Sequence, residues 1–253
     1  MKRPLFLVTN DDGFSADGIH ALADGVAEVA EVVVVAPDRE RSAAGHSLTL
    51  HHPLRATELS PGRYVVDGTP TDCVNWGANY LLRGRRPDAV LSGINFGLNL
   101  GDDVTYSGTV SAAFEGAILG IPSIAFSQEI EPGFSFDAAA SFARELALAM
   151  LENPLAPGTL LNVNVPAGEP KGVRAAKMGR RIYQEGVLEK LDPRGKKYYW
   201  IGAAPPTGNP EEGTDLWAIS RKFISVTPLH LDLTDYEALR TLDALVGRFA
   251  PTR

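Results

Sequence analysis

The amino-acid sequence predicts an α/β fold, in which a mostly parallel β-sheet is flanked by helices on both faces. Residues 32–35 are four consecutive valines, a β-branched run typical of a strand that is buried on both sides of its sheet. An earlier apolar run at residues 5–8 predicts a first strand, and the stretch between the two runs has helical spacing. In that stretch Ile19, Leu22, Ala23 and Val26 fall at positions i, i+3, i+4 and i+7. The order strand, helix, strand predicts a right-handed parallel crossover.

The predicted first strand runs directly into two carboxylates, Asp11 and Asp12, followed by Gly13. Side chains alternate along a strand, so both carboxylates can approach one ion only where the chain turns, which Gly13 permits. Adjacent carboxylates repel unless a cation or a proton lies between them, and a hard divalent cation prefers oxygen ligands. A solvent-exposed Asx turn is an equal alternative for this stretch alone. We expect Asp17 to be the N-cap of the following helix.

A polar loop at residues 36–47 follows the second strand and can reach the acidic pair, because ligand crevices of open α/β sheets lie at the carboxyl ends of strands. Within it, Ser42 is a candidate neutral oxygen ligand, and Arg39 and Arg41 could contact a phosphate. His46 could act as a general acid or base, but we expect an ordinary hydrogen-bonded surface histidine.

Residues 64–66 predict a short strand, and a helix start follows it. Thr69 is the expected N-cap, Pro70 stands at the first helical position, and Asp72 completes a capping-box pattern. We interpret Cys73 as a packing residue and not as a nucleophile, because no base is evident near it in the sequence.

Residues 89–91 predict the next buried strand, and a loop rich in glycine and asparagine is expected at residues 92–103. Asparagine offers an oxygen to a metal and an N–H group to a phosphate, and long loops in compact domains are usually functional. The alternative is ordinary turn chemistry. Asp102 and Asp103 rival the first acidic pair, but they do not directly follow a strand, so we expect them to order the loop or cap a helix.

A helix is expected to begin near residue 107, capped by Ser107 or Thr109, and its free N–H groups form a potential phosphate cradle. Its predicted buried stripe comprises Val110, Ala113, Phe114, Ala117 and Ile118. Residues 123–127 predict a strand, residues 137–151 an amphipathic helix, and residues 160–165 the last strand of the main sheet.

Beyond residue 166 the alternation of strands and helices gives way to proline, glycine and aromatic residues. We expect a core at residues 1–166, and a C-terminal extension at 167–253 that completes the same domain. The extension is predicted to hold a β-hairpin arm built from residues 177–188 and 197–201, a strand at 223–227 and a closing helix at 235–249. The arm would expose Tyr198, Tyr199 and Trp200, and exposed apolar surface of this kind usually contacts a partner subunit.

The composition of the whole chain restricts the function further. The net charge of −7 argues against a nucleic-acid polymer as partner, since such binding needs an extended basic face. No apolar run approaches the length of a membrane span or a signal peptide, and the single cysteine fits a reduced cytoplasm. The dinucleotide fingerprint G-x-G-x-x-G does not follow the first strand, which disfavours a dehydrogenase-like cofactor binder.

Five motifs occur in a specific order and spacing. They are residues 9–13 (Thr-Asn-Asp-Asp-Gly), 36–42 (Ala-Pro-Asp-Arg-Glu-Arg-Ser), 68–73 (Gly-Thr-Pro-Thr-Asp-Cys), 92–99 (Ser-Gly-Ile-Asn-x-Gly-x-Asn) and 106–110 (Tyr-Ser-Gly-Thr-Val). With them, the sequence resembles the survival protein SurE family of divalent-metal-dependent 5′-nucleotidases, and residues 213–215 and 227–229 extend the similarity towards the C-terminus.

The resemblance implies a Rossmann-like core that binds one Mg²⁺ or Mn²⁺ ion per subunit and hydrolyses nucleoside 5′-monophosphates. It implies that the arm is exchanged between subunits of a homodimer or homotetramer. The implied metal ligands are Asp11, Asp12, Ser42 and Asn95, of which Asp11 and Asp12 are also the catalytic candidates. The implied phosphate contacts are Asn99, Ser107, Gly108 and Thr109. Ala43 departs from the pattern, because many members carry glycine after the serine.

The residues themselves agree with this ligand set, because all four lie after predicted strands and donate hard oxygen atoms. No cysteine or well-placed histidine joins them, which favours Mg²⁺ or Mn²⁺ over zinc. Two alternatives stay open. An aspartate could act as the nucleophile, although D-D-G here differs from the D-x-D of phosphatases that do so. The chain could also be a nucleotide-binding regulatory protein without catalysis.

Overall fold

The computed structural model describes residues 3–182, 187–201, 207–208 and 210–249. Its strands are β1 (Leu5–Thr9), β2 (Glu31–Pro37), β3 (Ala56–Ser60), β4 (Arg63–Val66), β5 (Ala89–Phe96), β6 (Ser123–Gln128), β7 (Thr159–Val165), β8 (Val173–Ala175), β9 (Arg181–Ile182), β10 (Val187–Leu191), β11 (Lys197–Ile201), β12 (Thr207–Gly208) and β13 (Ile224–His230). Its α-helices are α1 (Asp17–Ala27), α2 (Pro70–Trp76), α3 (Gly108–Ile118), α4 (Asp137–Glu152), α5 (Asp215–Ser220) and α6 (Tyr236–Val246). Shorter helical segments are η1 (Gly77–Leu81), η2 (Gly101–Thr105) and η3 (Gly247–Phe249).

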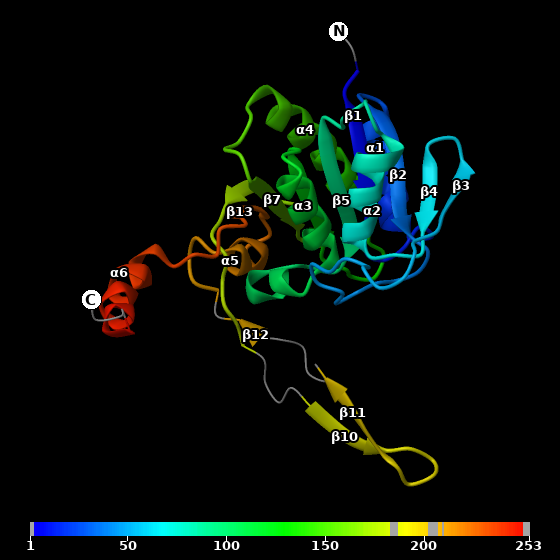
Figure 1. Cartoon of the computed structure of the whole chain (residues 1–253). Coiled ribbons are helices and arrows are strands. Elements are labelled where there is room, and N and C mark those ends of the chain that lie inside the picture. The colour runs from blue at the N-terminus through cyan, green and yellow to red at the C-terminus, as the bar shows by residue number, and fades with distance from the viewer. Residues whose placement is uncertain (1–2, 183–186, 202–206, 209, 250–253) are drawn as a thin grey trace.

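The predicted α/β class is confirmed, because a nine-stranded sheet forms the centre of the molecule (Figure 1). Its strand order is β3-β4-β2-β1-β5-β6-β7-β13-β8. Six neighbouring strands run parallel, namely β4, β2, β1, β5, β6 and β7. At the two sides of this group, β3 is antiparallel to β4 and β13 is antiparallel to β7. The parallel centre explains why β1 is buried along its whole length.

Helices cover both faces of this sheet, as the alternation of side chains along β1 shows. Phe6 and Val8 pack into the cluster that holds α1 and α4, whereas Leu5 and Leu7 pack into the cluster that holds α2. α3 adds Ala112 to the second cluster. The parallel strands therefore carry apolar side chains on both sides, and their carboxyl ends are left for polar chemistry.

The helix starts were partly predicted. Thr69 caps α2 with the full capping box: its hydroxyl accepts from the N–H group of Asp72, and the Asp72 carboxylate accepts from the N–H group of Thr69. Asp17, in contrast, is the first residue of α1, whose N-cap is Ala16, so that prediction was wrong. The Ser107 hydroxyl caps α3 by accepting from Val110 N at 3.1 Å. Ile118 was wrongly placed in the buried stripe of α3, since it is 54% exposed.

Two strand boundaries differ from the sequence prediction. The strand predicted at residues 89–91 continues to Phe96, because Asn95 and Phe96 pair with Ser127 and Gln128 of β6. The strand β7 is not the last strand of the main sheet, because β13 pairs with its free edge and β8 pairs with β13. The sheet therefore extends into the C-terminal third of the chain.

The C-terminal segments partly project from the sheet (Figure 1). β10 and β11 form an antiparallel hairpin, as predicted, closed by the hydrogen bond from Gly195 N to Asp192 O. Its first strand lies at residues 187–191 and not at the predicted 177–188, since β9 within that range pairs with β12 instead. Residues 183–186 of the predicted arm lie outside the described residues. The predicted final helix is present as α6, and it lies away from the sheet with Leu239 and Leu242 exposed. Within the described ranges, no helix combines the length and apolar character needed to cross a membrane.

Candidate active site

A cavity of about 660 Å³ opens at the carboxyl ends of the neighbouring strands β1, β2 and β5. The structure brings six of the eight predicted site residues to its wall, although they come from four separate stretches of the chain. These six are Asp11, Asp12, Ser42, Asn95, Asn99 and Ser107. Gly108 and Thr109 lie directly behind Asp11, as described below.

Asp11 is almost fully buried, with 4% of its surface exposed. Its carboxylate accepts a hydrogen bond from the Thr109 hydroxyl, which also lies 3.2 Å from the side-chain oxygen of Asn95. Burial raises the pKa of Asp11 from its usual 3.8 to about 6; the Thr109 hydroxyl opposes this rise and the charge of Asp12 adds to it. Ionising Asp11 in the folded protein therefore costs free energy, and a nearby positive charge would offset that cost.

Gly108 allows the start of α3 to approach Asp11 closely. A Cβ atom at position 108 would lie 2.7 Å from the Asp11 Cβ atom and 2.8 Å from its Oδ2 atom. Any side chain there would displace the carboxylate, so the glycine of this motif has a steric role at the site. Gly108 and Thr109 thus position Asp11.

Asp12 and Asn95 are held by neighbouring backbone groups. The Asp12 carboxylate accepts from Phe96 N at 3.1 Å, and the Asn95 amide donates to Gly97 O at 2.9 Å. Burial raises the pKa of Asp12 above its usual value, and the charge of Glu40 contributes in the same direction. With its nitrogen committed to Gly97, Asn95 has its oxygen available as a neutral ligand.

Ser42 is exposed at the cavity wall, and its hydroxyl donates to Glu40 Oε1 at 2.8 Å. This bond uses the hydroxyl proton and leaves the oxygen lone pairs free to bind a cation. The backbone ties this loop to the acidic turn, because Arg41 N donates to Asp11 O at 2.7 Å. Glu40 was not among the residues predicted for the site, since its only signal in the sequence is its position two residues before Ser42.

Asn99 is buried and firmly anchored. Its backbone N–H group donates to Asn164 Oδ1 at 2.8 Å, and its carbonyl accepts from the amides of Asn162 and Asn164. Its side-chain amide donates to the Ser127 hydroxyl at 2.8 Å. An amide nitrogen carries two N–H groups, so one remains for a ligand in the cavity.

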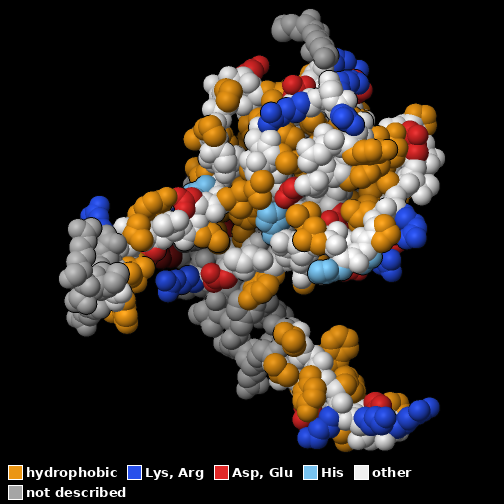
Figure 2. All heavy atoms as spheres, in the orientation of Figure 1, with side chains coloured by type: hydrophobic (Ala, Val, Ile, Leu, Met, Phe, Trp, Pro, Cys, Tyr) orange, Lys and Arg blue, Asp and Glu red, His pale blue; other side chains and the backbone are white. Residues whose placement is uncertain are grey.

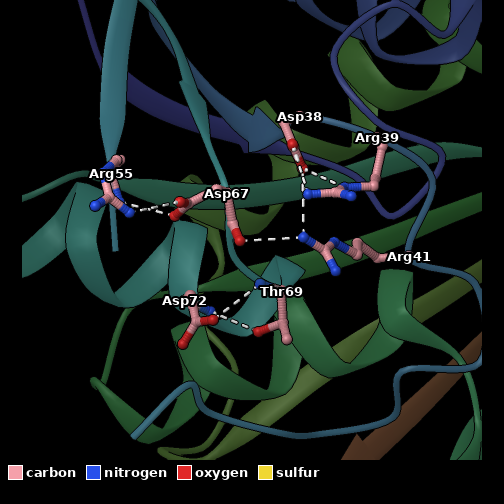
Figure 3. A network of polar contacts seen from close by, with 7 residues as sticks. All are labelled: Asp38, Arg39, Arg41, Arg55, Asp67, Thr69 and Asp72. Atoms are coloured by element: carbon pink, nitrogen blue, oxygen red, sulfur yellow. Dashed lines mark hydrogen bonds and ion pairs between the residues drawn. The ribbon is translucent and has the colours of Figure 1, made fainter. Parts of the chain in front are cut away.

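Three other candidate residues are engaged elsewhere. Arg39 and Arg41 both pair with Asp38, at 3.0 and 3.4 Å, and Arg41 also donates to Asp67 O at 3.1 Å (Figure 3). Neither arginine lines the cavity, so the idea that they contact a phosphate there is not supported. His46 pairs with the buried Glu115 at 3.1 Å, as expected for a structural histidine.

Cys73 is fully buried, and burial raises the pKa of its thiol well above the usual value. A protonated buried thiol is a poor nucleophile, which agrees with the packing role expected from the sequence.

The residues fit a hard divalent cation. Two carboxylates, both with raised pKa values, provide negative charge, and Ser42 and Asn95 add neutral oxygen atoms. In the part of the chain that the structure describes, no group of three or more histidine, cysteine, aspartate or glutamate side chains forms a metal cluster. A cation here would therefore depend on the serine and asparagine oxygens as well as on the two carboxylates.

Comparison with known proteins agrees with this site. The family model described as Survival protein SurE matches residues 6–185. Proteins named 5′-nucleotidase SurE from Syntrophotalea carbinolica and Geobacter sulfurreducens are each 55% identical to this chain. The alignments cover 94% of the chain in both cases, and 96% and 92% of the relatives.

A solved structure has the same fold. The crystal structure of the SurE protein from Aquifex aeolicus superposes with a TM-score of 0.85 at 45% sequence identity, covering 96% of this chain and 99% of that one. Identity of this extent over nearly the full length fixes both the fold and the family. The chain therefore belongs to the survival protein SurE family.

Proposed function

We propose that this chain is a divalent-metal-dependent phosphatase that hydrolyses nucleoside 5′-monophosphates to a nucleoside and phosphate. The observation that carries the proposal is the convergence of Asp11, Asp12, Ser42 and Asn95 on one cavity. The names of its relatives, 5′-nucleotidase SurE, support the substrate class.

In this proposal Asp11, Asp12, Ser42 and Asn95 hold one Mg²⁺ or Mn²⁺ ion. Such an ion supplies positive charge that polarises a phosphate oxygen and makes water more acidic. Asp11 or Asp12 accepts the proton of the attacking water, since both carboxylates line the cavity and both have raised pKa values.

The phosphate is held by donors from a different part of the wall. Asn99 provides its second amide N–H group, and Ser107 stands at the start of α3, where the helix presents free N–H groups. These donors are fixed before substrate arrives, so they can stabilise the negative charge that develops on the phosphoryl group.

Phosphate release from AMP and GMP, with Mn²⁺, with Mg²⁺ and with EDTA, tests the proposal. We expect turnover with a metal and a loss of activity in EDTA. Asp11→Asn and Asp12→Asn should lose activity by at least about 100-fold, whereas Asp24→Asn, an exposed carboxylate on α1, should behave as the parent. Full activity of Asp11→Asn, or turnover that is unaffected by EDTA, would contradict the assignment.

An aspartyl-phosphate route is distinguished by the stereochemistry at phosphorus. With a nucleotide whose phosphoryl group is made chiral by oxygen isotopes, direct attack by water is a single displacement and inverts the configuration at phosphorus. A covalent route needs two displacements and therefore retains the configuration. We expect inversion, because the Asp11 carboxylate is already bonded to Thr109 and packed against Gly108; retention would indicate the covalent route.

Self-association through the C-terminal extension is part of the proposal. Apolar side chains are exposed along the β10–β11 hairpin and on α6 (Figure 2), including Trp200 at 58% and Leu242 at 46%. Burying such surface against a second copy of the chain is favourable. Light scattering should give a dimer or tetramer mass, and Trp200→Asp should lower that mass whereas Lys190→Ala should not. A monomeric parent chain would refute this part.

A cytoplasmic location is also proposed, and it rests on the single cysteine of the chain. Cell fractionation with an antibody against the protein would test it, and recovery in the periplasmic or secreted fraction would refute it.

A further inference from the structure

One wall of the cavity is aromatic. Phe96, Phe134 and Phe136 line it together, and we call these three residues the aromatic wall. Phe96 is 60% exposed, Phe134 is half-buried and Phe136 is buried at 9%. The three rings therefore form a row from the protein core to the open cavity, and the Phe96 ring is the one most accessible to a bound ligand.

The rings of the aromatic wall support one another. The centroids of Phe96 and Phe134 lie 5.6 Å apart with the ring planes at 71°, and those of Phe134 and Phe136 lie 5.2 Å apart at 83°. Both are favourable edge-to-face arrangements. Phe136 belongs to the hydrophobic cluster that holds α1 and α4, so the exposed ring of Phe96 is anchored indirectly to the core.

The backbone of Phe96 is fixed as well. Its N–H group donates to the Asp12 carboxylate at 3.1 Å, and the residue pairs with Gln128 of β6. Phe96 also directly follows Asn95, one of the proposed metal ligands. An anchored aromatic ring thus stands next to the polar groups that are proposed to act on phosphate.

We propose that Phe96 is the residue that selects the substrate, by stacking against the base of the bound nucleotide. This inference rests on the proposed nucleotidase function. Every base has a π-face, so stacking accepts all bases, and it favours purines because their ring area is larger. The site should therefore prefer nucleotides to base-free sugar phosphates, and purine nucleotides to pyrimidine nucleotides.

The test compares two substrates that share a phosphate ester but differ in the base. The readout is the ratio of kcat/KM for AMP to kcat/KM for ribose 5-phosphate, measured with Mn²⁺. Phe96→Ala should lower this ratio by roughly 10-fold, the size typical of base–aromatic stacking. Phe96→Tyr should keep the ratio, and Phe96→Leu, which keeps apolar bulk without a π-face, should lower it. The ratio of kcat/KM for AMP to kcat/KM for CMP should be above one in the parent and should fall towards one in Phe96→Ala.

The ratio separates stacking from damage to the metal site. If Phe96→Ala disturbed only the hydrogen bond to Asp12, both substrates would lose activity together, the ratio would not change and the inference would be overturned. It would also be overturned if Tyr106→Ala, at the other exposed aromatic of the cavity, lowered the ratio and Phe96→Ala did not.

Tyr80→Ala is the matched control, because Tyr80 is a 68% exposed aromatic that does not line the cavity. The outcomes also separate the two proposals. A parent enzyme that releases no phosphate from AMP with any metal refutes the proposed function and this inference with it. A parent enzyme that is active, with an unchanged ratio in Phe96→Ala, refutes the inference alone.

Discussion

Asp11→Asn should stabilise the protein when no metal is bound and the pH is neutral or higher. Burial raises the pKa of Asp11 from its usual 3.8 to about 6, so the folded state binds this proton more tightly than the unfolded state does. The penalty for ionising Asp11 is absent below pH 3.8, grows as the pH rises and is complete above about pH 6. Asparagine removes the charge and keeps an oxygen that can accept from Thr109.

The magnitude follows from the size of the pKa change. A pKa that is raised by roughly two units lowers the free energy of unfolding by about 3 kcal/mol once Asp11 is ionised. This figure is an upper limit, because the structure relaxes around a buried charge. For a chain of this length, each kcal/mol moves the melting temperature by roughly 2–4 °C. In EDTA at pH 8 we therefore expect Asp11→Asn to melt about 5–10 °C above the parent.

Calorimetry or fluorescence-monitored melting, at pH 4 and pH 8 with EDTA or with millimolar Mn²⁺, measures the effect. In EDTA at pH 4, the melting temperature of Asp11→Asn should exceed that of the parent only slightly. Manganese at 100 times its dissociation constant stabilises the folded state by about 2.7 kcal/mol, so the parent should gain more than the variant and the difference between them should largely close. Asp24→Asn, with 72% of its side chain exposed, should show neither effect.

A variant that is less stable than the parent at pH 8 in EDTA would show that ionising Asp11 carries no such penalty. A difference of the same size at both pH values would show the same, because a purely structural effect of the substitution does not depend on ionisation. If Mn²⁺ stabilised both proteins equally, Asp11 would not be a metal ligand.

Three further predictions concern the residues around the site. Ala43 has a left-handed backbone with φ of 57°, so Ala43→Gly should stabilise the protein by about 0.5–1 kcal/mol in urea unfolding, and a loss of stability would show that no strain is relieved. Thr109→Val should lower kcat/KM by about 10-fold or more because the Asp11 carboxylate loses a donor, and Thr109→Ser should restore it; equal activity of the two variants would contradict this role. The hydrogen bond from His46 holds the pKa of Glu115 below its usual 4.5, so Glu115 stabilises the fold above pH 4.5 and this contribution is lost as the pH falls. Glu115→Gln should therefore lower the melting temperature at pH 7, and the difference should close at pH 3; a difference that persists there would refute the ionic contribution.

Local signals in the sequence predicted the parts of the structure that local forces build. The capping box at Thr69 and Asp72 involves atoms three residues apart, and the apolar run before Asp11 needs only a buried strand to explain it. Asp11 and Ser42 follow separate strands and Asn95 lies at the end of a third, so the sequence order predicted that they line one cavity, because the carboxyl ends of parallel strands meet at one edge. The metal-ligand set itself came from the resemblance to the family and stays a prediction.

Long-range pairing decided what the sequence did not predict. Residues 92–96 carry glycine, serine and asparagine, which are typical of turns, yet they continue β5 because β6 offers hydrogen-bond partners. The place of β13 beside β7 joins segments about 60 residues apart, and no local pattern specifies such a partner. The aromatic wall was missed for a related reason, since Phe134 reaches the cavity from a turn before α4 that is distant in sequence from Phe96.

Long-range contacts also hold the proposed phosphate donor Asn99 in place. Asn162 and Asn164 on β7 form hydrogen bonds with the backbone of Asn99. The buried Asp215 at the start of α5 accepts a hydrogen bond from Gly101 N at 2.8 Å. Each of these buried polar groups would lose stabilisation if its partner moved, because an unpaired buried hydrogen-bonding group costs about 1–3 kcal/mol. Asn162 and Asn164 belong to the core at residues 1–166, whereas Asp215 belongs to the extension and lies 114 residues after Gly101. We therefore expect the extension to support a loop of the proposed active site within the same subunit, in addition to any role in self-association.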